Sequence, residues 1–341
     1  MRLPQELLDA IVQDIDDAPT LKACSLAGSK LREQSQRKLL RSLTLAGYNR
    51  AAMCAVLKQS PHIASYVTDL TLYIPEEDYI SDPDFTVTDI EAMLAMVVNV
   101  RRCVFGGMDG SRRIWSDIPL RLSSAYSRFI LSQWSLHELV ITNIIELPPD
   151  MLLSLLRAAP TLTVRRVDVV DDLDVSQLPL QHVPGALRLR IGRGCLGLCR
   201  LFAYPQYASL TNGLTHLAIN AANPLTQSNT HIIISNAPRT LKSLRIQMAR
   251  ATFTFWYNRP SLHDFPPIIH RSLMSTLDAA LAAHPSSPYL KLRWQVDVRP
   301  NTQFNHGLRF DNFVYMIQEA LPSAHERGRL LITREPLNVE R

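Results

Sequence analysis

The sequence predicts an α/β protein in which a small N-terminal unit of three helices precedes a larger solenoid of parallel strands and helices. Two observations lead to this fold class. Apolar residues in the first 45 positions recur at helical spacing. Beyond them, a short alternating apolar pattern returns mostly at intervals of roughly 22 to 36 residues. A chain of 341 residues can form one small and one large folded unit, so we expect domains at residues 1–45 and 46–341.

The N-terminal segment has the spacing of three short helices. Pro4 suits the first turn of a helix, where its missing N–H costs nothing. The apolar stripe that follows consists of Leu7, Leu8, Ile11, Val12 and Ile15. A second short helix is predicted around Leu21–Leu26, and a third is predicted from a Ser29 cap through Leu39. Helices this short bury little apolar surface by themselves, so we expect the unit to dock on something.

Two motifs in this segment carry a resemblance to a known family. They read Leu3-Pro4-x-Glu6-Leu7-Leu8-x-x-Ile11 and Leu21-x-x-Cys24-Ser25-Leu26. With them the segment resembles an F-box, in the divergent form found in fungal F-box-like proteins. Where that family usually continues with Cys-Arg-x-Trp, this chain has Gly28, Ser29, Lys30 and Leu31.

The resemblance implies a partner and a binding surface. An F-box binds the Skp-type adaptor of a cullin-RING ubiquitin ligase through an apolar helical surface. Carried onto this chain, the adaptor contact is implied at Leu3, Pro4, Leu7, Leu8, Ile11, Leu21, Cys24 and Leu26. The alternative is a small three-helix cap that seals one end of the larger domain.

The larger domain is predicted from a repeat of the form apolar-x-x-Leu-x-apolar. Its clearest copies are Val67-Leu70-Leu72, Leu136-Leu139-Ile141, Leu214-Leu217-Ile219 and Leu241-Leu244-Ile246. Weaker copies are Val100-Cys103-Phe105, Val164-Val167-Val169, Ala186-Leu189-Ile191 and Tyr289-Leu292-Trp294. Helices are predicted between copies at Ala51–Ser60, Asp89–Asn99, Asp150–Ala159, Ile268–Ala283 and Asp311–Leu321. Such units stack to bury their leucines, since no single one closes a core.

This region resembles the irregular leucine-rich-repeat region that follows the F-box in such proteins. The resemblance implies a curved parallel sheet with helices outside and a surface that binds a client protein. An ordinary α/β domain whose parallel strands are rich in leucine is the alternative interpretation.

One block of the chain is basic throughout. Between Gln177 and His263 there are nine positive residues and no acidic ones, whereas the whole chain has a net charge of only +5. If the strands stack in register, four of these residues share a sheet face: Arg188, Arg190, Lys242 and Arg245. A one-signed face attracts an acidic or phosphorylated client. Nucleic acid fits less well, because no aromatic residues are interleaved from 188 to 200, and a solvated flank without a ligand is the third reading.

An aromatic cluster stands immediately before Pro260. It contains Phe253, Phe255, Trp256 and Tyr257, in a chain that is 7% aromatic. Phe255, Trp256 and Tyr257 are candidates for client binding, and a strand edge with buried rings is the alternative.

The sequence offers little support for catalysis, a cofactor or a metal. Gly192-x-Gly194-x-x-Gly197 matches a dinucleotide-binding turn. However, no acidic residue lies between Asp174 and Asp264 to hold a ribose, so a glycine turn between repeats is the preferred reading. Cys195 and Cys199 lack a second Cys or His pair nearby. We therefore expect no catalytic residue, no cofactor and no metal, and hence a protein that is not an enzyme.

The remaining features concern location and role. The five cysteines are odd in number and scattered, which suits reduced thiols. No apolar run approaches the roughly 18 residues that span a bilayer, and no secretory signal is visible. We expect a cytoplasmic or nuclear protein without a membrane partner. The sequence favours a substrate-receptor subunit of an SCF-type cullin-RING ligase, and the alternative is an interaction scaffold outside any ligase.

Overall fold

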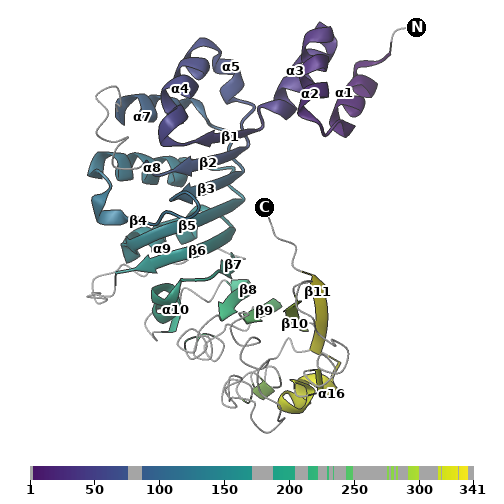
Figure 1. Ribbon diagram of the computed structural model, residues 1–341, viewed down its shortest axis with the longest axis vertical. Coiled ribbons are helices and arrows are strands. Elements are labelled where there is room, and N and C mark those ends of the chain that lie inside the picture. The colour runs from purple at the N-terminus through teal and green to yellow at the C-terminus, as the bar shows by residue number, and fades with distance from the viewer. Residues whose placement is uncertain are drawn as a thin grey trace. The chain divides into compact units, whose positions relative to one another are not determined.

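The computed structural model of the chain is an α/β structure with a mostly parallel arrangement of strands (Figure 1). The chain divides into two compact units, Met1–Ala159 and Pro160–Arg341. The structure describes residues 3–75, 87–170, 187–203, 214–221, 243–248, 291–298, 317–328 and 330–336, and single positions at 229, 233, 275, 278, 279, 282, 314 and 315.

Three short helices open the first unit. They are α1 Gln5–Asp14, α2 Ala18–Ala27 and α3 Ser29–Leu39. Helix α3 packs against both α1 and α2, and Val12 and Leu21 are buried at 0% and 4% exposure. The helices lie where the sequence predicts them, with one correction: Gly28 holds the N-cap position of α3, and Ser29 is its first residue.

Polar contacts hold this small bundle where its apolar core is thin. Asp17 caps α2, because the Thr20 backbone N–H donates to its Oδ2 at 2.8 Å. Hydrogen bonding to Thr20 holds the pKa of the Asp17 carboxyl below its ordinary value. On α3, the Lys38 ammonium donates to the carbonyl of Gln13 and lies 3.2 Å from Asp16 Oδ1. These contacts fix α3 to the end of α1 and the turn after it.

The bundle continues directly into a sheet. Strand β1, Ser42–Leu45, follows α3 and pairs in parallel with β2, Asp69–Tyr73. Two side-chain contacts accompany this junction. The Arg37 guanidinium lies 5.4 Å from the ring centroid of Tyr66, and Arg41 Nε lies 2.8 Å from Asp69 Oδ2. Residues 42–45 thus belong to the sheet, although the sequence places them with the helices.

The sheet of the first unit runs in chain order. Its order is β1-β2-β3-β5, with β3 at Arg102–Gly106, β5 at Glu138–Leu147 and the short β4, Arg113–Ile114, also paired with β5. All of these pairs are parallel. The repeat residues stand in register in two cross-strand rows, Leu70–Cys103–Leu139 and Leu72–Phe105–Ile141. All six are buried to 1% exposure or less, which confirms the predicted strands.

Helices lie along one side of these strands (Figure 1). They are α4 Arg50–Gln59, α5 Pro61–Ala64, α7 Val87–Met96, α8 Leu120–Ser132 and α9 Pro149–Ala158. Three of them, α4, α7 and α9, match predicted helices within a few residues, whereas α8 was not predicted. Phe105 of β3 meets Tyr126 of α8 edge to face, with ring centroids 5.5 Å apart. The predicted helix Asp311–Leu321 is described at positions 314, 315 and 317–321, and all of these except 321 are helical, whereas the predicted helix Ile268–Ala283 falls largely outside the described residues.

The second unit repeats the parallel pattern. Its strands follow chain order as β6 Thr161–Val169, β7 Leu187–Ile191, β8 Leu214–Ala221, β9 Ser243–Met248, β10 Lys291–Val298 and β11 Leu330–Pro336. Helix α10, Leu196–Ala203, packs on β6, and the short α16, Pro322–Glu326, precedes β11. One leucine row crosses all six strands: Leu162, Leu189, Leu217, Leu244, Leu292 and Leu330.

Strand β6 departs from its predicted pattern. The sequence favours Val164-Val167-Val169, but Leu162 and Val164 are the residues that pair with Leu189 and Ile191. Arg166 has a positive φ of 52°, and its backbone N–H donates to the carbonyl of Arg193 at 2.7 Å. This irregularity shifts the inward-facing positions, so Val167 and Val169 are also buried.

Candidate functional site

An apolar stripe on α1 is exposed. Leu3, just before the helix, is followed by Leu7 and Ile11 at four-residue spacing, which places the side chains on one side of α1 over successive turns. Their exposures are 53%, 52% and 52%. Val12, by contrast, is fully buried, so one side of α1 packs into the bundle and the other side is exposed. We call Leu3, Leu7 and Ile11 the α1 stripe.

The other residues predicted to contact an adaptor are distributed between surface and interior. Leu26, near the end of α2, is 82% exposed, and Pro4 is exposed at the N-cap of α1. Leu8 and Cys24 are half-buried. Leu21 lies inside the bundle, so its side chain supports the unit from within and is not part of the open surface.

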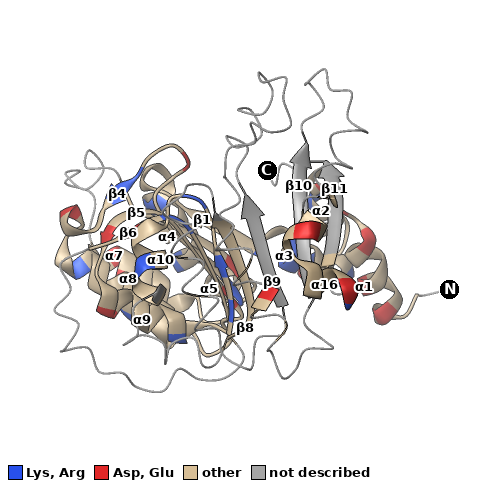
Figure 2. Cartoon of the chain, turned by 90° about the horizontal axis from the view of Figure 1, so that it is seen from below, with Lys and Arg blue, Asp and Glu red and all other residues tan. Residues whose placement is uncertain are grey.

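Polar and acidic groups accompany the α1 stripe. The Gln5 amide donates to Asp9 Oδ1 at 2.8 Å and to the Lys30 carbonyl at 2.7 Å, which links the start of α1 to the start of α3. Glu6 and Asp14 are exposed on the same helix, and Figure 2 shows the acidic residues of α1 in red. The unit therefore offers leucine and isoleucine side chains beside solvated carboxylates, as a protein-binding surface does.

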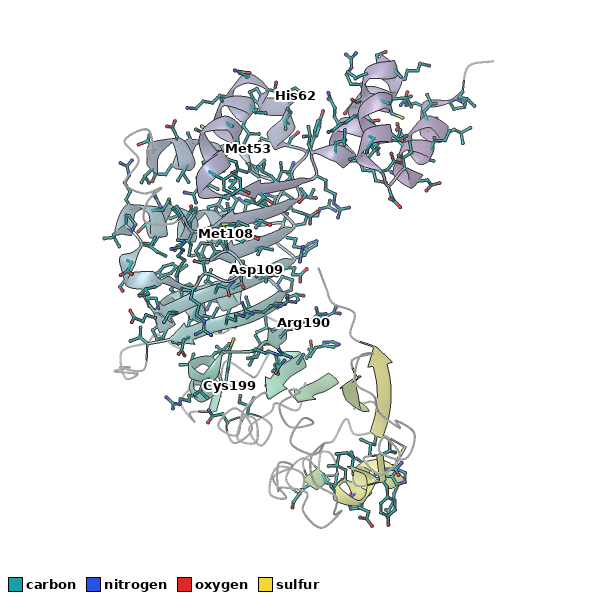
Figure 3. The ribbon with its side chains drawn as sticks, in the orientation of Figure 1. Met53, His62, Met108, Asp109, Arg190 and Cys199 are labelled. Carbon is teal, nitrogen blue, oxygen red and sulfur yellow. The ribbon has the colours of Figure 1, made fainter. Side chains whose placement is uncertain are left out.

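Part of the predicted basic surface lies on β7. Arg188 and Arg190 are exposed, whereas the alternate residues Leu187, Leu189 and Ile191 are each 2% exposed. Because side chains alternate along a strand, both arginines are on the face of β7 opposite its buried residues. Figure 3 labels Arg190 on β7 and Cys199 on α10. The side chain of Cys199 is fully buried.

The strand register places Arg245 in the same row as Arg190. Arg190 pairs with Ala218 of β8, and Ala218 pairs with Arg245 of β9. The register continues from Arg245 to Arg293 of β10. Sequence reasoning missed Arg293 as a member of this row, because residue 293 lies beyond the acid-free block that ended at residue 263. The signal was available in the weak repeat copy at Tyr289-Leu292-Trp294, which fixes the register of this strand.

Four predicted client-binding residues lie outside the described part of the chain. They are Lys242, Phe255, Trp256 and Tyr257.

The glycine turn after β7 packs closely against β6. A Cβ added at Gly192 would lie 2.9 Å from Arg165 Cγ, and one at Gly197 would lie 2.6 Å from Asp168 Oδ1. The Asp168 carboxylate accepts a hydrogen bond from the Gly197 N–H at 3.1 Å, at the start of α10. In a dinucleotide site that helix start would bind a phosphate. Here the carboxylate of Asp168, on β6, occupies the start of the helix.

The cysteines are free thiols, and most are buried. Cys54, Cys103, Cys195 and Cys199 are buried, and Cys24 is half-buried. Burial raises the pKa of both Cys103 and Cys199 to about 12. Within the described residues, no group of three His, Cys, Asp or Glu side chains could hold a metal ion.

No family model matches the sequence, and no curated protein matches it significantly.

Of the helices in the described stretches, none has the length and apolar character needed to cross a membrane.

Proposed function

We propose that this chain is the substrate-receptor subunit of an SCF-type cullin-RING ubiquitin ligase. The bundle α1–α3 acts as an F-box-like unit that binds the Skp-type adaptor. The strands and helices after it form an irregular leucine-rich-repeat solenoid that holds a client protein.

The open α1 stripe is the observation that carries this proposal. Fully burying a leucine or isoleucine side chain contributes about 1.5–3 kcal/mol, so three half-exposed side chains offer on the order of 3 kcal/mol to a partner. A bundle of some 40 residues already has few apolar side chains inside it. That it leaves Leu3, Leu7 and Ile11 open favours a surface kept for a partner.

The repeat rows support the second half of the proposal. Each described strand presents its leucine or equivalent residue in register with its neighbours, as stacked repeats would. Alternate residues such as Arg188 and Arg190 remain exposed on the other face, which gives the sheet a surface for a client.

The adaptor contact is tested by Leu7→Asp/Ile11→Asp in the full chain. Both side chains are half exposed, so the variant should fold. It places two carboxylates in an apolar contact, where each costs a few kcal/mol. We expect pull-down or biolayer interferometry with a purified Skp-type adaptor to show at least a hundredfold loss of affinity.

Leu120→Asp is the matched control, because Leu120 is 82% exposed on α8 and lies outside the bundle. It should bind the adaptor like the wild type. Equal adaptor binding by the wild type and the Leu7/Ile11 variant would overturn the ligase assignment.

The second candidate is an interaction scaffold in which the bundle only caps the sheet. Two contacts favour it, Arg37 on Tyr66 and Arg41 with Asp69, since they join the end of α3 and the residue two positions after it to the start of β2 and the segment before it. A scaffold of this kind would bind no Skp-type adaptor, so absence of binding by the wild-type chain would select it.

A further inference from the structure

Two cross-strand rows of the second unit collect basic residues. The first row contains Thr163, Arg190, Ala218, Arg245 and Arg293. The second contains Thr161, Arg188, His216, Ser243 and Lys291. We call them the cationic rows. On β7 they alternate with members of the buried rows that begin at Leu162 and Val164, so Arg188 and Arg190 lie on the face of that strand opposite its buried residues.

The first unit shows what the fold does with charges at the same position of the repeat. There, the residues just before the first buried row are Asp69, Arg102 and Glu138, in register on β2, β3 and β5. They are compensated: Arg102 Nε lies 3.2 Å from Glu138 Oε2, and Arg41 Nε lies 2.8 Å from Asp69 Oδ2. Opposite charges alternate across the strands, and the row is nearly neutral.

Arg188 and Arg190 of the cationic rows lack this compensation among the residues that the structure describes. Arg188 occupies the position of Arg102, but its register neighbours are Thr161 and His216. Among the described residues, no carboxylate lies within 4.0 Å of Arg188 or Arg190. The one acidic residue of β6 to β8 is Asp168, whose Oδ1 already accepts the Gly197 N–H. Within the part of the chain that the structure describes, the two arginines are therefore exposed without an acidic partner.

Their fields reinforce each other. Arg188 and Arg190 are alternate residues of one strand, so they are about 6.6 Å apart. This spacing is shorter than the Debye length of about 8 Å at physiological salt. A surface of one sign on this scale attracts anions and steers their approach.

We propose that the cationic rows bind an extended acidic segment of a partner protein, with Asp or Glu at alternate positions. Side chains at positions i and i+2 of an extended chain repeat at about 6.6 Å, which matches the spacing of Arg188 and Arg190 along β7. Each guanidinium can take one carboxylate in bidentate fashion. In naming the client's chemistry this inference rests on the proposed function, although the binding itself does not require the ligase.

A protein partner fits these rows better than nucleic acid does. Single-stranded nucleic acid gains about 1–3 kcal/mol for each base stacked on an aromatic ring. The described positions of the cationic rows contain no Phe, Tyr or Trp. Bidentate carboxylate contacts need only the arginines that are present.

The test is fluorescence anisotropy with the full chain and a labelled peptide of alternating Glu and Ala. A peptide of alternating Gln and Ala should not bind. Arg188→Glu/Arg190→Glu should lower the affinity for the Glu peptide about tenfold or more, because each charge reversal removes an attraction and adds a repulsion. Raising the salt from about 0.05 M to 0.5 M should weaken binding by the wild type too.

Lys22→Glu/Lys30→Glu makes the same change in net charge with exposed residues of the bundle and should leave peptide affinity unchanged. Arg188→Gln/Arg190→Gln tests loss of charge without repulsion, and circular dichroism melting checks that both β7 variants fold. The inference is overturned if the wild type does not bind the Glu peptide, or if the β7 variants bind it equally well. Displacement of the peptide by a lower concentration of oligonucleotide would overturn it in favour of nucleic acid.

Failure here is separable from failure of the proposed function. Adaptor binding is measured on the bundle variants, and Arg188→Glu/Arg190→Glu should leave it unchanged. A chain that binds the adaptor but not the peptide overturns this inference alone.

Discussion

Asn143 shows how one residue ties a strand to the loop beside it. Its φ is +55°, and its side chain is 1% exposed. The Nδ2 group donates to the carbonyls of Gly107 and Met108, each at 3.2 Å. Asn is among the few residues enriched at positive φ, so this position needs both the backbone tolerance and the amide.

Substituting Asn143 separates these two requirements. Asn143→Gly keeps the backbone conformation and loses the hydrogen bonds, which should cost about 1–2 kcal/mol. Asn143→Leu loses the same bonds and adds backbone strain of about 1–3 kcal/mol. Urea unfolding of the full chain measures both. Equal stability of the two variants would mean that the backbone conformation at this position is not strained for a larger residue.

At the scale of single residues, the sequence predicts which side chains are apolar but not which are covered. Leu7 and Leu8 are neighbours in one predicted stripe, yet Leu7 is exposed and Leu8 is half-buried. Leu21 and Leu26 belong to one motif, yet only Leu26 is open. The difference depends on how α3 packs against α1 and α2, which the spacing within a single helix does not contain.

At the scale of elements, the strands were the most predictable part. The period-two alternation with leucine places β2, β3, β5 and β7 to β10 close to their observed positions. The shift in β6 follows from the positive φ of Arg166, which no apolar pattern encodes. Helix α8 escaped prediction because three serines, Ser123, Ser124 and Ser127, interrupt its apolar side. The common row of Arg190 and Arg245 was predictable, because the leucines of β7, β8 and β9 fix the register between these strands.

The contact between β6 and the start of α10 gives a prediction for one glycine. In Gly197→Ala the new Cβ would meet Asp168 Oδ1 at 2.6 Å and the Val169 backbone N at 3.0 Å. We expect a loss of about 1–3 kcal/mol by urea unfolding, because the close approach is partly to backbone atoms. Gly28→Ala is the control, since its Cβ would have nothing within 4 Å and its φ of −177° is ordinary extended backbone. Equal stability of both variants would contradict close packing at Gly197.

At the scale of the whole molecule, the bundle and the sheet of the first unit differ in how much they bury. In residues 3–40 the buried side chains are Val12, Leu21 and Ser35. The strands beside them carry two complete buried rows. Segments with few buried contacts open at lower free energy than the core does.

Hydrogen exchange should therefore separate the bundle from the strands. We expect the amides of α1 to α3 to exchange faster than those of β2, β3 and β5 in the free chain, as followed by mass spectrometry. Adding the Skp-type adaptor should slow exchange in α1, since a ligand stabilises the state that it binds. Bundle amides as protected as the strands without adaptor would instead support the scaffold, in which the helices are an integral cap.

The order of the strands has a consequence for how the chain is made. Among the described strands of each unit, every strand after the first, apart from the two-residue β4, pairs with a strand that precedes it in the sequence, as in β1-β2-β3-β5 and β6-β7-β8-β9-β10-β11. Proteins leave the ribosome from the N-terminus, and their parts fold as they emerge. Each of these later strands therefore meets a partner that has already been synthesised and does not wait for a distant C-terminal segment. Assembly can follow translation, with one growing edge open to wrong pairing at a time.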